Sequence, residues 1–387
     1  MNLSQIAKTI KTSPTLALNE KFAILKKKGE QVIHLGGGEP KSKAPMDAII
    51  PISEHLNTRE VRYTPAAGIP ALKQAIIGYT EEFYNRKVQQ ENVIAASGAK
   101  HAIMLALQAI LNPQEEVIFP VPYWVSYPDL ARLCGAIPVP ASPEDGSFYP
   151  GIKDIENRVS SHTKAVIINS PNNPSGVIYS EKFISDIVRF CENKDLYLIM
   201  DDIYHRLIFD GKTIINPYDY AKNFDESSKL IIVNGVSKQY AMTGFRIGWA
   251  VANTKLIEAM TKIQGHQTSG PSVLLQKAAI GAINGDQSGV EELRTTLEKN
   301  RNIMIELLNS FEGVKVTKPD GTFYCFADFS AYEKDSNKLS NFLIDKTQVL
   351  AVPGAGFGME GYLRLSYCGS VEDINEGIQR IKNVLMK

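Results

Sequence analysis

The sequence predicts an α/β fold in which a mostly parallel sheet is covered by helices on both sides, followed by a smaller α+β region. Two observations carry this prediction. Short apolar runs bounded by turn residues alternate with helical patterns through the middle of the chain, whereas the last hundred residues carry long helical patterns and fewer strands. A chain of 387 residues is also long enough for two domains with a sizeable core.

The middle of the chain supplies the predicted parallel sheet. Helical spacing of apolar residues covers 99–111 and 180–193, and Ser180 stands where it can cap the second helix. Strands that alternate with helices form parallel sheets with both faces covered, so their strands are apolar throughout. Runs of this kind lie at residues 117–120, 165–169, 196–200, 230–234 and 246–251.

The C-terminal part predicts a smaller domain of different make-up. Helical patterns extend over 256–283 and 289–308, and a terminal helix ends the chain. The first forty residues precede the first motif of the large domain, so we expect them to pack with the C-terminal part. The predicted division is 40–285 for the large domain and 1–39 with 286–387 for the small one. The strands predicted in the small domain are residues 314–316, 322–327 beyond a Pro319-Asp-Gly turn, and 363–367.

Composition argues against several classes of protein. The 42 basic residues balance the 42 acidic ones, so no global field attracts nucleic acid or an anionic membrane. The four cysteines are far apart and the six histidines lack metal-ligand spacing, so neither a disulfide framework nor a metal site is predicted. The N-terminus has no long apolar stretch and the apolar runs are too short to span a bilayer. We expect a cytoplasmic enzyme.

Polar strings stand at several predicted strand ends. Ser97-Gly98-Ala99-Lys100 opens a helix and can cradle a phosphate, although for this string alone a simple glycine turn is the better explanation. The string 170–176, Ser-Pro-Asn-Asn-Pro-Ser-Gly, offers an amide where open α/β sheets bind ligands, or forms a simple turn. Asp201 follows a buried run, where a carboxylate needs a partner: it caps the next segment or faces a cation.

The string 237–249, Ser-Lys-Gln-Tyr-Ala-Met-Thr-Gly-Phe-Arg-Ile-Gly-Trp, carries a lysine and an arginine after another predicted strand. Burial and nearby cations lower the pKa of a lysine and make its amine a nucleophile, which fits Lys238. Arg246 stands in an apolar, glycine-bearing context that suits a phosphate or carboxylate. For a lone lysine and a lone arginine, surface and structural roles are the simpler explanation.

The order of these strings along the chain resembles the fold-type-I pyridoxal-phosphate (PLP) aminotransferases, the aspartate aminotransferase superfamily. The matching strings extend from about Gly36 to Arg364, and Gly-Glu-Pro near the start is similar to that of bacterial aspartate aminotransferases. The resemblance implies a seven-stranded, mostly parallel sheet, the cofactor PLP, and transfer of an amino group from an L-amino acid, aspartate favoured, to 2-oxoglutarate by ping-pong kinetics. It also implies a homodimer with shared sites.

The resemblance assigns roles to individual residues. Lys238 matches the Schiff-base lysine, Asp201 the partner of the pyridine nitrogen, and Tyr204 with Asn173 the pair at the ring oxygen. In the substrate site, Arg364 matches the clamp on the α-carboxylate and Gly38 a backbone contact, while Lys11 is a candidate for the choice among dicarboxylates. The remaining cofactor contacts are Ser97, Gly98, Ala99, Lys100, Ser237 and Arg246 at the phosphate, Trp124 stacked on the ring, and Tyr63 reaching the phosphate of the neighbouring subunit.

Two other functions fit the same strings. A carbon–sulfur β-lyase would use Lys238 and Asp201 on the same cofactor and differ only in its substrate pocket. A PLP-fold regulator would have lost catalytic residues or gained a DNA-binding module, neither of which is evident. The preferred amino donor stays open, because the sequence shows no unambiguous second arginine for a distal carboxylate.

Overall fold

A seven-stranded sheet organises most of the chain in the computed structural model, which describes all residues except 1, 11, 13, 223–226 and 387. Strand β8 runs antiparallel to both of its neighbours, and the other pairs are parallel. The predicted mostly parallel sheet of seven strands is therefore confirmed. The strand order is β2 (Val93–Ala96), β8 (Gly248–Val251), β7 (Leu230–Gly235), β6 (Tyr197–Asp201), β5 (Thr163–Asn169), β3 (Glu116–Pro120) and β4 (Ile137–Ala141).

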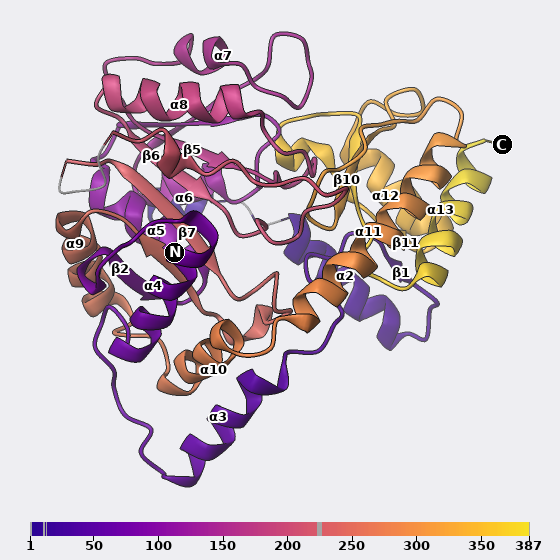
Figure 1. Ribbon diagram of the computed structural model, residues 1–387. Coiled ribbons are helices and arrows are strands. Elements are labelled where there is room, and N and C mark those ends of the chain that lie inside the picture. The colour runs from indigo at the N-terminus through magenta and orange to yellow at the C-terminus, as the bar shows by residue number, and fades with distance from the viewer. Residues whose placement is uncertain (1, 11, 13, 223–226, 387) are drawn as a thin grey trace.

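Helices cover both faces of this sheet, as Figure 1 shows. Alternate residues of a strand point to opposite faces, and the strands here are apolar on both. Along β6, Leu198 and Met200 belong to the core on one face and Ile199 to the core on the other. The first face packs on α4 (Pro70–Tyr84), α7 (Ile152–Glu156), α8 (Glu181–Asn193) and α10 (Val273–Asn284), and the second on α5 (Ala99–Ile110), α6 (Tyr127–Leu133) and α9 (Thr254–Gln267).

The C-terminal part forms a second, antiparallel sheet with its own core. Its strand order is β12 (Val352–Pro353), β13 (Tyr362–Ser366), β10 (Tyr324–Asp328) and β9 (Lys315–Val316). Strand β1 (Ile33–His34) pairs in parallel with β11 (Val349–Leu350), so this stretch of the N-terminal segment lies against the C-terminal part. The division at residues 40 and 285 stays a prediction. The helices here are α11 (Ser288–Asn309), α12 (Ser336–Thr347) and α13 (Val371–Leu385).

The remaining elements lie near the N-terminus or connect the larger ones. Helix α3 (Met46–Asn57) packs along α10 at the lower end of the molecule in Figure 1. Ser180 caps α8 as predicted, because its hydroxyl accepts a hydrogen bond from the Phe183 N–H. Two further helices are α1 (Gln5–Thr9) and α2 (Pro14–Lys27), and 3₁₀ turns occupy Gln90–Asn92, Pro217–Asp219, Thr243–Phe245 and Gly354–Phe357.

Three details of the sequence interpretation are wrong. The pattern over 256–283 is two helices, because Gly270 and Pro271 end α9 and a new helix starts at Val273. The string Ile137–Ala141 contains two prolines and was not predicted as a strand, yet it forms β4 at the edge of the sheet, where proline is tolerated. Arg246 has a left-handed backbone conformation, with φ of 52°, and precedes β8 instead of starting it.

Candidate active site

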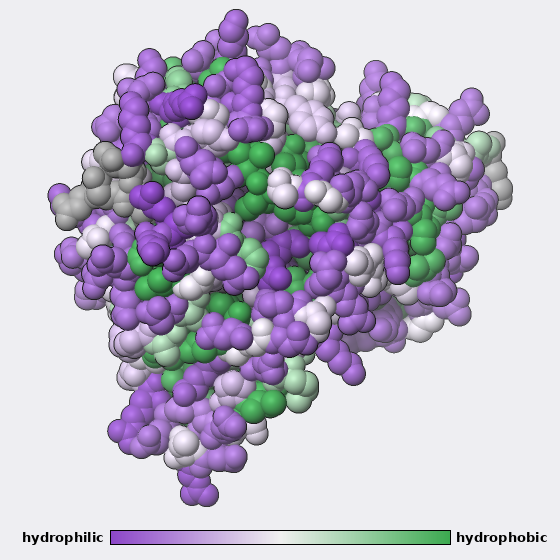
Figure 2. Space-filling view, in the orientation of Figure 1, coloured by the Kyte–Doolittle hydropathy of each residue, from purple (hydrophilic) through white to green (hydrophobic). Residues whose placement is uncertain are grey.

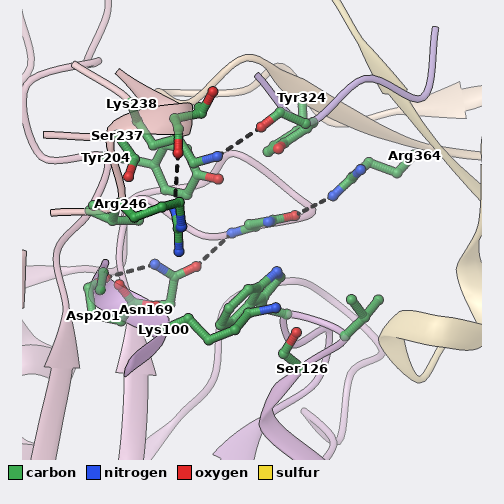
Figure 3. Close-up of a pocket in the computed structure, with 17 residues that line it drawn as sticks. Lys100, Ser126, Asn169, Asp201, Tyr204, Ser237, Lys238, Arg246, Tyr324 and Arg364 are labelled. Atoms are coloured by element: carbon green, nitrogen blue, oxygen red, sulfur yellow. Dashed lines mark hydrogen bonds between the residues drawn. The ribbon is translucent and has the colours of Figure 1, made fainter. Parts of the chain in front are cut away.

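A pocket lies at the carboxyl ends of β5, β6 and β7, where α/β sheets of this kind bind ligands (Figure 3). The start of α5 and the strand β13 complete its walls. The structure therefore brings together residues as far apart in sequence as Gly38 and Arg364. Of the residues predicted for the site, the following line the pocket: Gly38, Ala99, Lys100, Trp124, Asn173, Asp201, Tyr204, Ser237, Lys238, Arg246 and Arg364.

Lys238 follows β7 and points into the pocket, where its Nζ donates a hydrogen bond to the Gly38 carbonyl oxygen at 2.8 Å. Burial lowers the pKa of its amine to about 8, and the positive charges of Arg364 and Arg246 act in the same direction. A lysine with such a pKa is deprotonated in a substantial fraction of molecules near neutral pH. Such an amine, directed into a pocket, suits the role of a nucleophile.

Asp201 ends β6 and is 4% exposed. One carboxylate oxygen, Oδ2, accepts a hydrogen bond from the Tyr127 hydroxyl at 2.7 Å, while Oδ1 is buried without a partner. Burial raises the pKa of Asp201 to about 6, against the opposing effects of the Tyr127 hydroxyl, the Ile203 backbone N–H and the Lys238 charge. A buried, unpaired carboxylate oxygen is costly unless a ligand supplies a donor. The free oxygen fits a protonated ring nitrogen.

The start of α5 forms an anion cradle. The first N–H groups of a helix have no acceptor within the helix, and Gly98 stands just before them with φ of 90°. A Cβ at Gly98 would crowd the Arg246 guanidinium, and the positive φ at this position also favours glycine. Arg246 itself donates to the carbonyl oxygens of Thr243 at 3.0 Å and Ser97 at 3.4 Å. This arrangement suits a phosphate.

Arg364 lies on β13, is 2% exposed and faces the pocket from the opposite side. It donates to Asn173 Oδ1 at 3.0 Å and to the Gly36 carbonyl oxygen at 3.2 Å, and its Nε is buried without a partner. The guanidinium stacks over the Tyr324 ring, 4.0 Å from its centroid. A buried cation that meets only neutral groups suits a carboxylate ligand, which it can bind through two parallel hydrogen bonds.

Two aromatic residues predicted for the cofactor lie between these charged groups. Tyr204 is buried, and its ring packs edge-on against that of Tyr324, with 6.1 Å between the centroids. Burial raises the pKa of Tyr204 well above its usual value, so the phenol keeps its proton. Trp124 lies at the pocket wall, with the Lys100 Nζ 4.9 Å from its ring centroid. Both rings are placed to contact a flat ligand.

Not every residue predicted for the site lines this pocket. Tyr63 is 95% exposed and does not line the pocket, so a role at a phosphate requires a second subunit. Lys11 lies outside the described residues. Ser97 and Gly98 belong to the backbone of the anion cradle and do not line the cavity directly.

The sequence interpretation missed residues that shape the pocket. Tyr127 starts α6 and fixes Asp201 by its hydroxyl, while Asn169 bridges two strands by donating to the Asp201 carbonyl oxygen at 2.7 Å and accepting from the Asn173 N–H at 2.8 Å. Tyr324 supports both Arg364 and Tyr204. Tyr127 belonged to the aromatic string after Pro122, and Asn169 ended a predicted strand, so both positions carried a usable signal.

The profile of the family "Aminotransferase class I and II" matches residues 30–381. The chain belongs to this family. It is 37% identical over 386 residues to an aspartate aminotransferase of Bacillus sp. (strain YM-2), with 98% of each chain covered, and 36% identical to one of Bacillus subtilis (strain 168), with 100% of each covered. The family resemblance and the prediction of an aspartate aminotransferase-like transaminase are thereby confirmed.

A solved structure leads to the same conclusion for the fold. The aspartate aminotransferase from Thermus thermophilus with maleate superposes with a TM-score of 0.94 at 32% identity, and 100% of both chains is covered. The predicted fold class is therefore confirmed. The described residues contain no helix long and apolar enough to cross a membrane, and no cluster of side chains that could hold a metal ion.

Proposed function

We propose that this transaminase binds PLP in the pocket through Lys238 and moves an amino group from an L-amino acid, with aspartate favoured, to 2-oxoglutarate. One observation carries the proposal. Two buried groups of opposite charge, Asp201 Oδ1 and Arg364 Nε, face the same pocket without partners in the described structure. Each suits one part of the reacting pair: the carboxylate suits a protonated pyridine nitrogen, and the guanidinium suits a substrate carboxylate.

The residues present fit the cofactor, which when bound supplies an electron sink for the bond broken at the substrate Cα. Asp201 would keep the ring nitrogen protonated by charge pairing in a buried site. Tyr204 and Asn173 would hydrogen-bond the ring oxygen, and Trp124 would stack on the ring. The phosphate would bind at the start of α5, with Ser97, Gly98, Ala99, Lys100, Ser237 and Arg246.

Lys238 and Arg364 would handle the substrate. Arg364 would orient the α-carboxylate with two parallel hydrogen bonds. The Lys238 amine, which now donates to the Gly38 carbonyl oxygen, would hold the cofactor and, once displaced, carry the proton away from the substrate Cα. Its lowered pKa suits this exchange, because the amine must accept and return a proton near neutral pH. Tyr324 would exclude water from this region by packing over Arg364.

A dicarboxylic substrate is supported by the charge of the pocket. Four cationic side chains line it, namely Lys100, Lys238, Arg246 and Arg364, against the single carboxylate of Asp201 among the lining residues. This excess of cationic side chains favours a strongly anionic set of ligands. The Thermus structure named with maleate holds a dicarboxylate in a protein of the same fold.

A homodimer in the cytoplasm is part of the proposal. Apolar side chains are exposed along α3 and just after it, including Met46, Ile50, Leu56 and Val61, and Figure 2 shows apolar atoms over α3 among hydrophilic ones. An exposed apolar set of this kind marks an interface. Tyr63 lies beside this surface and would reach the phosphate of the neighbouring subunit.

The test compares the wild-type chain with Lys238→Ala after incubation with PLP. The wild type should show the visible absorbance band of lysine-bound cofactor, and Lys238→Ala should lack it. A panel of amino acids is then added without acceptor; aspartate should convert the band fastest. An unchanged spectrum in Lys238→Ala contradicts the proposal. Release of pyruvate and ammonia from cystathionine without a keto acid would favour the β-lyase instead.

A further inference from the structure

Behind Lys238, on the face of the sheet that packs on α4, lies a group of buried polar side chains that the reaction does not use. Asn234 lies near the end of β7, His205 follows β6, and Tyr79 comes from α4. Gln239 is the residue directly after Lys238. All four are at most 4% exposed. Buried polar groups almost always have hydrogen-bond partners, so the contacts of these four side chains show how they are held.

Hydrogen bonds connect these side chains. Tyr79 donates its hydroxyl proton to Gln239 Oε1 at 3.0 Å, and His205 Nε2 lies 2.7 Å from the Tyr79 oxygen. His205 Nδ1 lies 3.1 Å from the Asp202 carbonyl oxygen and 2.9 Å from Asn234 Nδ2. Burial lowers the pKa of His205 to about 3, which agrees with a neutral ring.

The chain of hydrogen bonds closes on itself. Asn234 Oδ1 accepts from the Gly235 N–H at 2.8 Å, and Gln239 Nε2 donates to the Gly235 carbonyl oxygen at 3.3 Å. The two ends of the chain thus meet at one residue. We call this closed set the 79–205–239 ring; it consists of Tyr79, His205, Asn234, Gly235 and Gln239. The segment 234–239, which holds Lys238, is its closing side.

The ring also connects to the strand that carries Asp201. Successive residues of β6 point to opposite faces, so Asp201 faces the pocket and Asp202 faces α4. Asp202 accepts from the Tyr84 hydroxyl at 3.0 Å, and that hydroxyl accepts from Asn234 Nδ2 at 3.2 Å. The Asn234 side-chain amide therefore connects Asp202, the neighbour of Asp201 in sequence, to the segment 234–239 that carries Lys238.

We propose that Tyr79, His205 and Gln239 are positioning residues that fix the Lys238 amine relative to Asp201. None of them lines the pocket, so they act through the 234–239 backbone and not by contact with substrate. The distance between a nucleophile and the group it reacts with controls the rate strongly: a displacement of about 1 Å can cost 10²-fold. The inference rests on the proposed function, because that function assigns the cofactor to Lys238 and Asp201.

The experiment removes a single oxygen from the ring. Tyr79→Phe leaves the Gln239 carbonyl oxygen and His205 Nε2 without their partner but keeps the aromatic packing. Tyr367→Phe is the matched control, because Tyr367 is equally buried and its hydroxyl donates to the Gly321 carbonyl oxygen at 3.2 Å, away from the ring. Should Tyr79→Phe fail to fold, Gln239→Met opens the same ring.

Two quantities are measured on the full-length chain. In the cofactor-loaded enzyme, Tyr79→Phe should slow the reaction with amino donor about tenfold at unchanged KM. Without cofactor, it should speed amide hydrogen exchange in residues 234–239. Tyr367→Phe should change neither quantity. Wild-type exchange in Tyr79→Phe, or equal effects of both variants, overturns the positioning role. If wild-type Lys238 binds no PLP, the proposed function fails, while the exchange comparison still reports on the ring.

Discussion

Two buried arginines of this protein have opposite surroundings. Arg301, on α11, is 0% exposed and donates to both carboxylate oxygens of Asp210, at 2.7 and 2.8 Å, and to the Pro319 carbonyl oxygen. Arg364 is equally inaccessible, yet it meets only neutral oxygens and keeps its Nε unpaired. The first cation is paired within the fold, and the second is left for a ligand.

The end of β6 repeats this contrast with two neighbouring carboxylates. Asp201 faces the pocket with one oxygen unpaired, whereas Asp202 faces α4 and accepts from Tyr84 within a connected set of hydrogen bonds. Both are buried, so burial alone does not identify a functional group. The two carboxylates differ in that Asp201 keeps an oxygen without a hydrogen-bond partner. Such an oxygen is expected where a ligand supplies the missing donor.

The largest effect should come from the unpaired carboxylate. Asp201→Asn keeps an oxygen for Tyr127 but loses the charge that would hold a ring nitrogen protonated. Loss of about two pKa units of charge pairing corresponds to about 3 kcal/mol, so the rate with amino donor should fall by about 10²- to 10³-fold. Stopped-flow absorbance measures it. Asp202→Asn is the control and should lose less than about tenfold; equal losses would remove the distinction between the two carboxylates.

Arg364→Leu tests the unpaired cation. The variant loses charged hydrogen bonds to the substrate carboxylate, each worth about 1.5–3 kcal/mol, so kcat/KM for the amino donor should fall by about 10²-fold. Its stability should stay within about 1 kcal/mol of the wild type, because replacing an unpaired buried charge by an apolar side chain removes a desolvation cost. Steady-state kinetics and urea unfolding measure the two quantities. A large loss of stability would mean that Arg364 serves the fold.

Much of the fold and of the site was predictable from sequence, for physical reasons that differ between elements. Strands β5, β6 and β7 are apolar on both faces, which a run of residues displays directly. Edge strand β4 carries prolines and partly exposed side chains, so its pattern is that of a loop. Helices α9 and α10 share a helical period, and only Gly270 and Pro271 separate them.

The residues of the site also differ in how far the sequence could predict them. Lys238 and Arg246 lie in a distinctive string, and family resemblance placed them. Tyr324 supports Arg364 and Tyr204 only because β10 pairs with β13, with Phe326 opposite Arg364. Its role depends on register between strands, which spacing along the chain does not show. The ring behind Lys238 depends likewise on contacts between α4, β7 and the segment after β6.

Arg301, the arginine paired with Asp210, should contribute to stability and not to catalysis. Asp210→Asn removes the carboxylate paired with the buried Arg301 and leaves that of Glu298, 3.7 Å away. Removing one partner of a fully buried ion pair costs about 3 kcal/mol, and we expect about 2 kcal/mol here because Asp210 is partly exposed and Glu298 offsets part of the loss. Urea unfolding at neutral pH measures it, with kcat per folded molecule unchanged. A variant that unfolds like the wild type but loses activity would contradict the assignment of Arg301 to the fold.

The smallest effect concerns pH and the carboxylate that faces α4. Burial raises the pKa of Asp202 to about 7, and the nearby Asp201 charge acts in the same direction. A carboxyl whose pKa is higher in the folded chain binds more protons there, so folding is favoured below its unfolded pKa and loses free energy as pH rises from about 4 to about 7. Asp202→Asn does not titrate but can still accept from Tyr84. The stability of the cofactor-free variant relative to wild type should therefore increase by about 1–2 kcal/mol between pH 4.5 and pH 7.5, measured by urea unfolding at each pH. A constant difference across that window would mean that Asp202 is already ionised in the folded chain at low pH, and that the set of hydrogen bonds behind the sheet stabilises its charge better than its burial suggests.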